Sequence, residues 1–287
     1  AELSCVRDRV GGRVRGHPDL GALPLAPGAR PNTAVRALLM GCEHERIHIE
    51  TSSVLVRELP QHLVRRHPAF PPPHPARAAD RDAVPPLAFV DLPAGTSVIG
   101  KPRDWPTFGW DNEYGRREIA VPELAAAERL VTNAELHAFV AAGGYREARW
   151  WTADGWRWRT FRNAKRPAFW VPEGPAGLHR YRLRTIFETL DMPWDWPALV
   201  NAHEAHAYAA WRGARDGCTY RLPTEAEHHR MRGRIVDAPE ADAATAVCGA
   251  RMPREAHANL ALAYGSEQPV AALPPNDAGL RDVAGPA

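Results

Sequence analysis

The spacing of the apolar residues changes once along this 287-residue chain. Over residues 33–59 the apolar positions recur with a period near 3.6, which predicts one long amphipathic helix. Asn32 or Thr33 can cap its start, and Pro60 ends it because proline cannot continue the hydrogen-bond ladder. We expect four residues to face a core of packed helices: Leu38, Leu39, Val54 and Leu55.

Residues 67–86 separate this helical pattern from a different one. The segment is rich in proline, alanine and arginine, so it is stiff and extended and predicts a linker between domains. Beyond it the apolar period falls to near 2. Residues 87–90 and 96–100 then read as two strands of a hairpin around a turn at residues 93–95.

Two helices are predicted within the second half. One covers residues 132–142, with Thr132 as N-cap, Glu135 in the capping-box position and a Gly-Gly pair after its end. The other covers residues 201–212. Five tryptophans crowd into a short stretch and predict an aromatic core, with a substrate cage as the alternative: Trp150, Trp151, Trp156, Trp158 and Trp170.

Composition and charge exclude several classes of protein. The net charge of +2, with 24% charged residues, gives no basic field for nucleic acid. No apolar run is long enough for a transmembrane helix, and the first residues lack the apolar region of a secretory signal. The four cysteines are scattered without a C-x-x-C pair: Cys5, Cys42, Cys218 and Cys248. We therefore expect free thiols, a cytoplasmic protein and no membrane partner.

The candidate chemistry lies on the long helix, where His44 and His48 are four residues apart. This spacing places both imidazoles on one helical face, where they could bind one metal ion. Solvated or core histidines are the alternative. The string His44-Glu45-Arg46-Ile47-His48 also matches the H-E-x-x-H motif of zinc peptidases, but residues 49–59 contain no third ligand of the metzincin type, and the chain then becomes proline-rich.

The helix sequence EHERIHIETSSVLVRELP resembles the HxxxHxE helix of the non-haem iron sulfoxide synthases, in particular the ovothiol branch, 5-histidylcysteine sulfoxide synthase. The second half resembles the formylglycine-generating-enzyme-like domain, a C-type-lectin-like fold, through LPAGTSVIG, VTNAELHAFV, VNAHEAHAYAAWRG and YRLPTEAEHHRMRG. The segments FGWDNE, FRNAKRPAFWV and MPWDWP are closer to the sulfoxide synthases. In such a domain the residues Arg221, Thr224, Glu225 and Glu227 are expected to cap and tie loops.

The resemblance implies an α+β fold in three parts. Residues 1–66 would be part of a DinB-like helical domain, residues 67–86 the linker, and residues 87–287 the formylglycine-generating-enzyme-like domain. In the family an early helix supplies a third iron-binding histidine, and further strands follow the last residues present here. The chain is therefore expected to be incomplete at both ends and, as it stands, to have little activity.

The resemblance also implies the reaction and the site. An Fe(II) centre would couple L-cysteine to the imidazole ring of L-histidine with O2, giving 5-histidylcysteine sulfoxide. His44 and His48 would be iron ligands, with Glu50 supporting them. A catalytic tyrosine is expected but not assigned; Tyr114 and Tyr264 are candidates. The alternatives are an ergothioneine-type sulfoxide synthase, or a truncated, inactive paralogue that acts as a binding module.

Overall fold

The computed structural model describes residues 12, 16, 34–68, 70–78, 80–101, 109–232, 259 and 264–283. The chain divides into two compact units. The first unit comprises Ala1–Thr51, Val98–Ile119 and Ile235–Met252, and the second comprises Ser52–Ser97, Ala120–Arg234 and Pro253–Ala287. The described residues combine helices with small sheets, consistent with the predicted α+β class.

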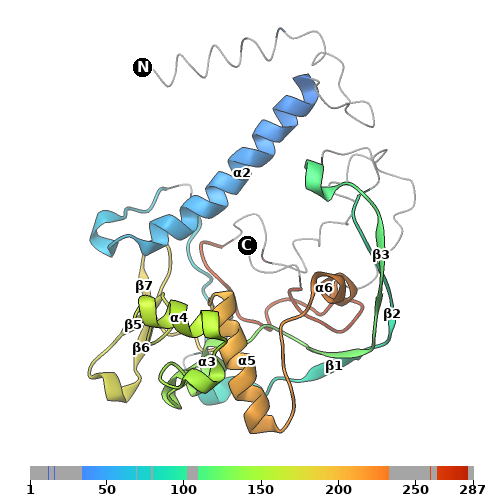
Figure 1. Cartoon of the computed structure of the whole chain (residues 1–287). Coiled ribbons are helices and arrows are strands. Elements are labelled where there is room, and N and C mark those ends of the chain that lie inside the picture. Colours follow the sequence, from blue (N-terminus) through green and yellow to red (C-terminus); the bar gives the residue numbers. More distant parts are fainter. Residues whose placement is uncertain are drawn as a thin grey trace. The chain divides into compact units, whose positions relative to one another are not determined.

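Helix α2 (Ala34–Glu58) confirms the long helix predicted over residues 33–59 (Figure 1). Its predicted apolar core face is wrong. Leu55 is 63% exposed, Leu38 and Val54 are exposed as well, and Leu39 alone of the four is half-buried. The physical reason is that no other helix of the described residues packs along α2, so its periodic apolar side chains have no partner layer there. The DinB-like bundle therefore stays a prediction.

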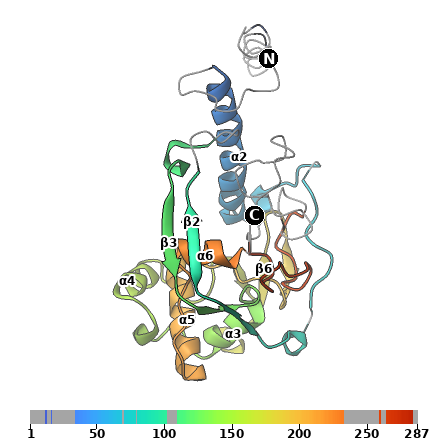
Figure 2. The same ribbon diagram turned by 90° about the vertical axis from the view of Figure 1, so that its right-hand side faces the viewer.

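The predicted hairpin over residues 87–100 is also wrong. Strand β1 (Phe89–Leu92) pairs antiparallel with β4 (Leu124–Ala127), and β2 (Gly95–Ile99) pairs with β3 (Arg117–Val121). The neighbouring strands β2 and β3 are seen side by side in Figure 2. The short segment at Pro93 bends the chain and does not reverse it, so β1 and β2 each find a partner far along the sequence.

A third sheet, of three strands, lies within the second unit. Strands β5 (Trp170–Pro172), β6 (Tyr181–Arg184) and β7 (Thr189–Asp191) form an antiparallel meander in that order. Trp170 pairs with Leu183, which in turn pairs with Leu190, and all three side chains are buried. One paired residue from each strand thus contributes to the apolar core.

Helices α3 (Asn133–Ala141) and α5 (Ala202–Asp216) confirm the two predicted helices. Thr132 and Glu135 form the predicted capping box. Helix α5 continues four residues past the predicted end, to Asp216. Its C-cap is Gly217, whose φ of 70° is the left-handed conformation that glycine adopts without strain. The shorter helices are α4 (Ala153–Phe161), α6 (Glu225–Met231), η2 (Gln61–Leu63), η3 (Arg81–Ala83), η4 (Asp111–Glu113), η5 (Ala148–Trp150) and η6 (Ala176–Leu178).

The tryptophan cluster forms the main core of the second unit, as predicted. Trp151 and Trp170 are buried, and Trp150, Trp156 and Trp158 pack partly buried against them. Helices α3, α4 and α5 supply much of the remaining apolar surface of this core. The rings meet in tilted, stacked and edge-on arrangements, which aromatic side chains favour. The cluster therefore stabilises the domain, and the substrate-cage alternative has no support here.

The proline-rich segment predicted as a linker is irregular apart from η3, and it is bound to the rest of the second unit. The backbone N–H of Ala78 donates to Asp195 at 2.7 Å, and the indole of Trp196 donates to the carbonyl oxygen of Ala76 at 3.0 Å. The backbone N–H of His74 donates to Ser266 at 2.9 Å. The predicted domain boundaries themselves stay a prediction.

Among the described residues, no helix is both long and apolar enough to span a bilayer. Cys42 and Cys218 are free thiols, as predicted. Cys5 and Cys248 lie outside the described residues.

Candidate functional site

His44 and His48 lie on α2 in the first unit, one helical turn apart. Their ring centroids are 4.4 Å apart and the ring planes are nearly perpendicular, at 85°. Both side chains are exposed, as is Glu50. The helix thus places two imidazoles next to each other at its surface, as the spacing predicted, and both can be reached by a metal ion.

Two imidazole donors from one helix fit part of an iron site. Iron(II) accepts imidazole ligands, and a catalytic centre needs a third protein ligand to hold the metal firmly while leaving positions open. Within the part of the chain that the structure describes, no group of three or more His, Cys, Asp or Glu residues could hold a metal ion. The pair is therefore a partial site, and its role as ligand stays a prediction.

A loop of the first unit contacts α2 upstream of the histidines. Arg36 donates to the carbonyl oxygen of Gly109 at 3.1 Å and to Asp111 at 2.7 Å, and its guanidinium lies 6.0 Å from the ring of Tyr114. Gly109 packs closely against Tyr114, because a Cβ there would lie 3.1 Å from the Tyr114 hydroxyl and would require the ring to shift slightly. This loop includes most of the predicted FGWDNE segment; Phe108 lies outside the described residues.

The two candidate tyrosines have different surroundings. Tyr114 is half-buried in the loop that contacts Arg36. Tyr264 lies in the second unit, where its ring packs edge-on against that of His74 at 4.4 Å. A chemical role for either tyrosine stays a prediction.

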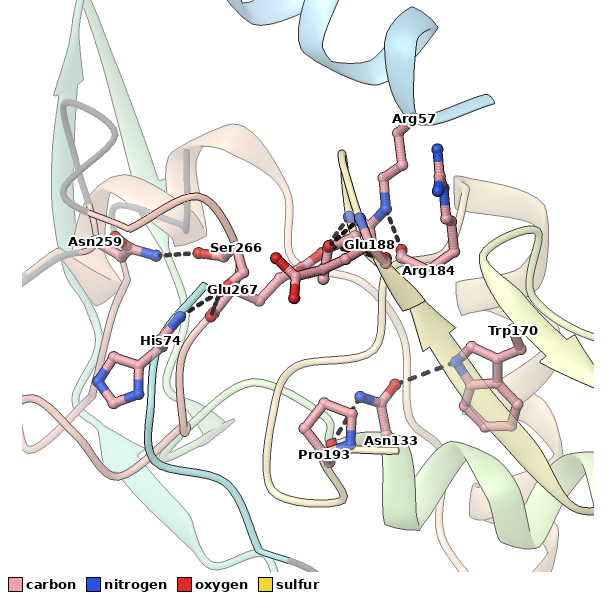
Figure 3. Close-up of polar contacts among 11 residues, drawn as sticks. Arg57, His74, Asn133, Trp170, Arg184, Glu188, Pro193, Asn259, Ser266 and Glu267 are labelled. Carbon is pink, nitrogen blue, oxygen red and sulfur yellow. Dashed lines mark hydrogen bonds and ion pairs between the residues drawn. The ribbon is translucent and has the colours of Figure 1, made fainter. Parts of the chain in front are cut away.

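The last turn of α2 belongs to the second unit and is held there by Arg57, a residue that sequence reasoning missed. Its guanidinium forms a 2.6 Å ion pair with Glu267, donates to the carbonyl oxygen of Arg184 at 2.6 Å, and lies 4.3 Å from the Phe169 ring. Figure 3 shows Arg57 reaching from the end of α2 towards Arg184 and Glu267. Its hydrophilic side chain gave no signal of burial in the sequence.

A second arginine lies against this buried charge. Arg184 is buried, and both its burial and the nearby Arg57 lower the pKa of its guanidinium. One nitrogen on each arginine, and one oxygen of Glu267, has no hydrogen-bond partner in the structure. The anchor of α2 is therefore a tightly coupled group of charges, in which the carboxylate of Glu267 is the stabilising partner.

The YRLPTEAEHH segment ties loops together, as predicted. Thr224 caps α6, and the carboxylate of Glu227 accepts from the backbone N–H of Thr224 at 2.7 Å. Arg221 donates to both oxygens of Glu227, at 2.7 and 2.5 Å. These hydrogen bonds, led by that from Arg221, lower the pKa of Glu227 to about 2. Glu225 lies in the first turn of α6. The geometry of this segment is that of a structural cap.

Comparison with known proteins gives relatives for up to 66% of the chain. The chain is 35% identical over 191 residues to a hercynine oxygenase of Mycolicibacterium thermoresistibile, covering 66% of this chain and 38% of that protein. A hercynine oxygenase of Mycolicibacterium smegmatis is 34% identical over 186 residues, covering 64% of this chain and 36% of the relative. Ergothioneine biosynthesis protein 1 of Neurospora crassa is 34% identical over 114 residues, covering 37% and 13% respectively.

The chain spans less than two fifths of the length of these curated relatives. The family profile of the sulfatase-modifying factor enzyme 1-like domain matches residues 75–287, which is most of the chain and includes the aromatic core, the capped helices and the Arg221–Glu227 pair. The chain therefore belongs to the family of proteins with a sulfatase-modifying factor enzyme 1-like domain.

Proposed function

We propose that this chain is part of an Fe(II)- and O2-dependent sulfoxide synthase, an oxidoreductase that forms a carbon–sulfur bond between a thiol and an imidazole ring. Two observations support the proposal together. His44 and His48 present adjacent imidazoles on one face of α2, and relatives of the chain carry the names hercynine oxygenase and ergothioneine biosynthesis protein. The paired histidines are the single observation on which a metal-dependent reaction depends.

The overall reaction balances with O2 as the only oxidant. A thiol and an imidazole C–H combine with one O2 to give a sulfoxide and one water. One oxygen atom enters the sulfoxide, and the other leaves in water with the two hydrogens. Iron(II), when bound, would supply the redox chemistry with O2.

The residues of this chain would hold the metal and leave room around it. His44 and His48 would each give one neutral imidazole nitrogen, and Glu50, two residues further on, could support their orientation. Because both histidines come from a single rigid helix, their spacing is fixed before the metal arrives. A third ligand would complete the site.

The substrates are proposed as L-cysteine and L-histidine, on the resemblance of the α2 sequence to the ovothiol branch. The second candidate is the ergothioneine type, and the names of the relatives favour it. The two differ physically. A trimethylated histidine carries a quaternary ammonium, which aromatic faces or carboxylates recognise, whereas free histidine has a primary ammonium that needs hydrogen-bond acceptors.

Product analysis by mass spectrometry tests the proposal. The protein is loaded with Fe(II) without oxygen, mixed with cysteine and an equal mixture of histidine and trimethylhistidine, and exposed to air. Because the histidine pair is a partial site, only a small amount of coupled sulfoxide is expected from the native sequence, and the same small amount from a His206→Ala control, which removes an exposed histidine of α5. No sulfoxide is expected from His48→Ala. Preferential coupling of trimethylhistidine would replace the ovothiol assignment by the ergothioneine type. A failure to form either sulfoxide would count against the proposed sulfoxide synthase function.

A further inference from the structure

A cavity of about 570 Å³ lies within the second unit, away from the histidine pair of α2 in sequence. Its walls come from the proline-rich segment, from the β5–β6 hairpin and from the residues that follow β7. Four arginines line it: Arg77, Arg81, Arg180 and Arg182. The proposed function uses none of these residues.

Arg81 is held in place at the cavity wall by two aromatic side chains. Its Nη1 lies 2.9 Å from Nδ1 of His137, and its guanidinium lies 5.4 Å from the ring of Trp194. Nε2 of His137 lies 2.8 Å from the carbonyl oxygen of His179. Because a carbonyl can only accept, Nε2 carries the proton, and Nδ1 accepts from Arg81. The buried imidazole therefore fixes the direction of the guanidinium.

This arrangement leaves most donors of Arg81 available. A guanidinium has five N–H donors, and the described residues engage one of them, through His137. The planar fork of an arginine matches the two oxygens of a carboxylate or phosphate, and stacking on an indole keeps the fork oriented without occupying its N–H groups. An oriented fork beside a cavity is suited to bind an anion.

The carboxylates at the cavity do not neutralise this arginine. Asp80 accepts from the backbone N–H of Asp82 at the start of η3, and Asp191 lies 3.3 Å from Nε of Arg182. Glu173 is the third carboxylate of the lining, so the four arginines exceed the carboxylates by one charge. The lining therefore has an excess of positive charge close to the oriented fork.

We propose that this cavity is a binding site for a small oxyanion, a carboxylate or a phosphate, with Arg81 as the residue that binds the two oxygens. His137 acts through Arg81 as a positioning residue. The site is independent of the proposed iron chemistry, because it requires neither a metal nor the histidines of α2.

The chain offers a matched control in Arg149. This arginine also stacks on an indole, with its guanidinium 4.4 Å from the ring of Trp150. It pairs with Glu147 and does not line the cavity. Replacing Arg149 therefore removes an arginine stacked on tryptophan without touching the proposed site.

Nuclear magnetic resonance tests the site on the whole chain without iron. The Nε–H signal of Arg81 and the indole N–H signal of Trp194 are followed while sodium acetate or sodium phosphate replaces sodium chloride at constant ionic strength. We expect saturable shifts of both signals with at least one of the two anions. The anion that gives the lower Kd, acetate or phosphate, shows whether the site prefers a carboxylate or a phosphate ligand.

Arg81→Gln should raise the Kd at least tenfold, and Arg149→Gln should leave it unchanged. Arg81→Lys should also weaken binding, since a lysine keeps the charge but loses the fork. Circular dichroism checks that each variant is folded, and Arg81 is exposed, so its replacement should not disturb the core. The absence of saturable shifts with both anions, or an equal Kd in Arg81→Gln, would overturn the proposal.

Discussion

Arg57 and Glu267 are 210 residues apart in the sequence and form a 2.6 Å ion pair in which both side chains are almost fully buried, at 8% and 11% exposure. The pair joins the last turn of α2 to a segment near the end of the chain, and the carbonyl oxygen of Arg184 completes the contact. Because the surroundings exclude water, each charge depends on the other for its stability.

Replacing Arg57 by Met should therefore lower the free energy of unfolding by about 3–5 kcal/mol, because it leaves the Glu267 carboxylate buried and unpaired. Urea unfolding measures the change. The control is Arg157→Met, which breaks an exposed pair with Asp154 on α4 and should cost less than about 1 kcal/mol. Similar losses in the two variants would contradict the buried-pair account.

The Arg221–Glu227 contact should make stability depend on acid pH. The pKa of Glu227 falls from 4.5 to about 2 in the folded protein. Because the pKa of Glu227 is lower in the folded protein than in the unfolded chain, its ionised carboxylate stabilises the fold at pH values above about 4.5. This stabilisation is lost as the pH falls from about 4.5 through about 2. Comparing urea unfolding of the native chain with Glu227→Gln should therefore show a stability difference at pH 7 that shrinks towards pH 2. A difference that stays constant with pH would be against this role.

His137 should make stability depend on pH in a higher range. Burial lowers the pKa of the His137 imidazole below 6.5. The hydrogen bond to His179 opposes this shift, and the positive charge of Arg81 adds to it. The ring of Tyr181 also faces the imidazole. The unfolded chain then binds a proton more readily, so stability should decrease as the pH falls below about 6.5 and level off below the folded pKa. In His137→Gln this part of the pH profile should disappear, and an unchanged profile would contradict the assignment.

Gly144 should not tolerate a side chain. A Cβ there would lie 2.0 Å from a ring carbon of Phe139, which is fully buried and cannot move aside. Gly144→Ala should therefore lower the free energy of unfolding by about 1–3 kcal/mol or more, the cost of an overpacked core. Gly177→Ala is the control, because nothing lies within 4 Å of its Cβ position. A neutral Gly144→Ala variant would mean that the core around Phe139 is loosely packed.

Local sequence signals predicted the capped helices well. The capping box at Thr132 was evident because it depends on residues three positions apart, and Thr224 was expected to cap without a capping box being assigned to it. The long helix was equally clear, since its period extends over many residues. The pair His44 and His48 could be placed on one face from spacing alone, and the structure brings the rings together.

Interactions between distant segments could not be predicted in this way. The hairpin expected around Pro93 failed because β1 and β2 pair with strands beyond residue 116, and the pattern of apolar residues does not specify a partner. The same limit applies to α2. The period of its apolar residues identified one apolar face, but it could not show that this face is largely exposed among the described residues. The burial of Arg57 depends on Glu267, and no local pattern connects the two.

Iron binding by the histidine pair of α2 is the claim on which the proposed function depends. The native chain, His44→Ala, His48→Ala and the His206→Ala control are incubated with Fe(II) without oxygen and dialysed, and the bound iron is measured by elemental analysis. Circular dichroism checks the fold, which should be unchanged because the three histidines are exposed. We predict that the native chain and the control retain iron and that both α2 variants lose it, since each removes one of two adjacent imidazoles. Undiminished iron in His44→Ala and His48→Ala would contradict the account.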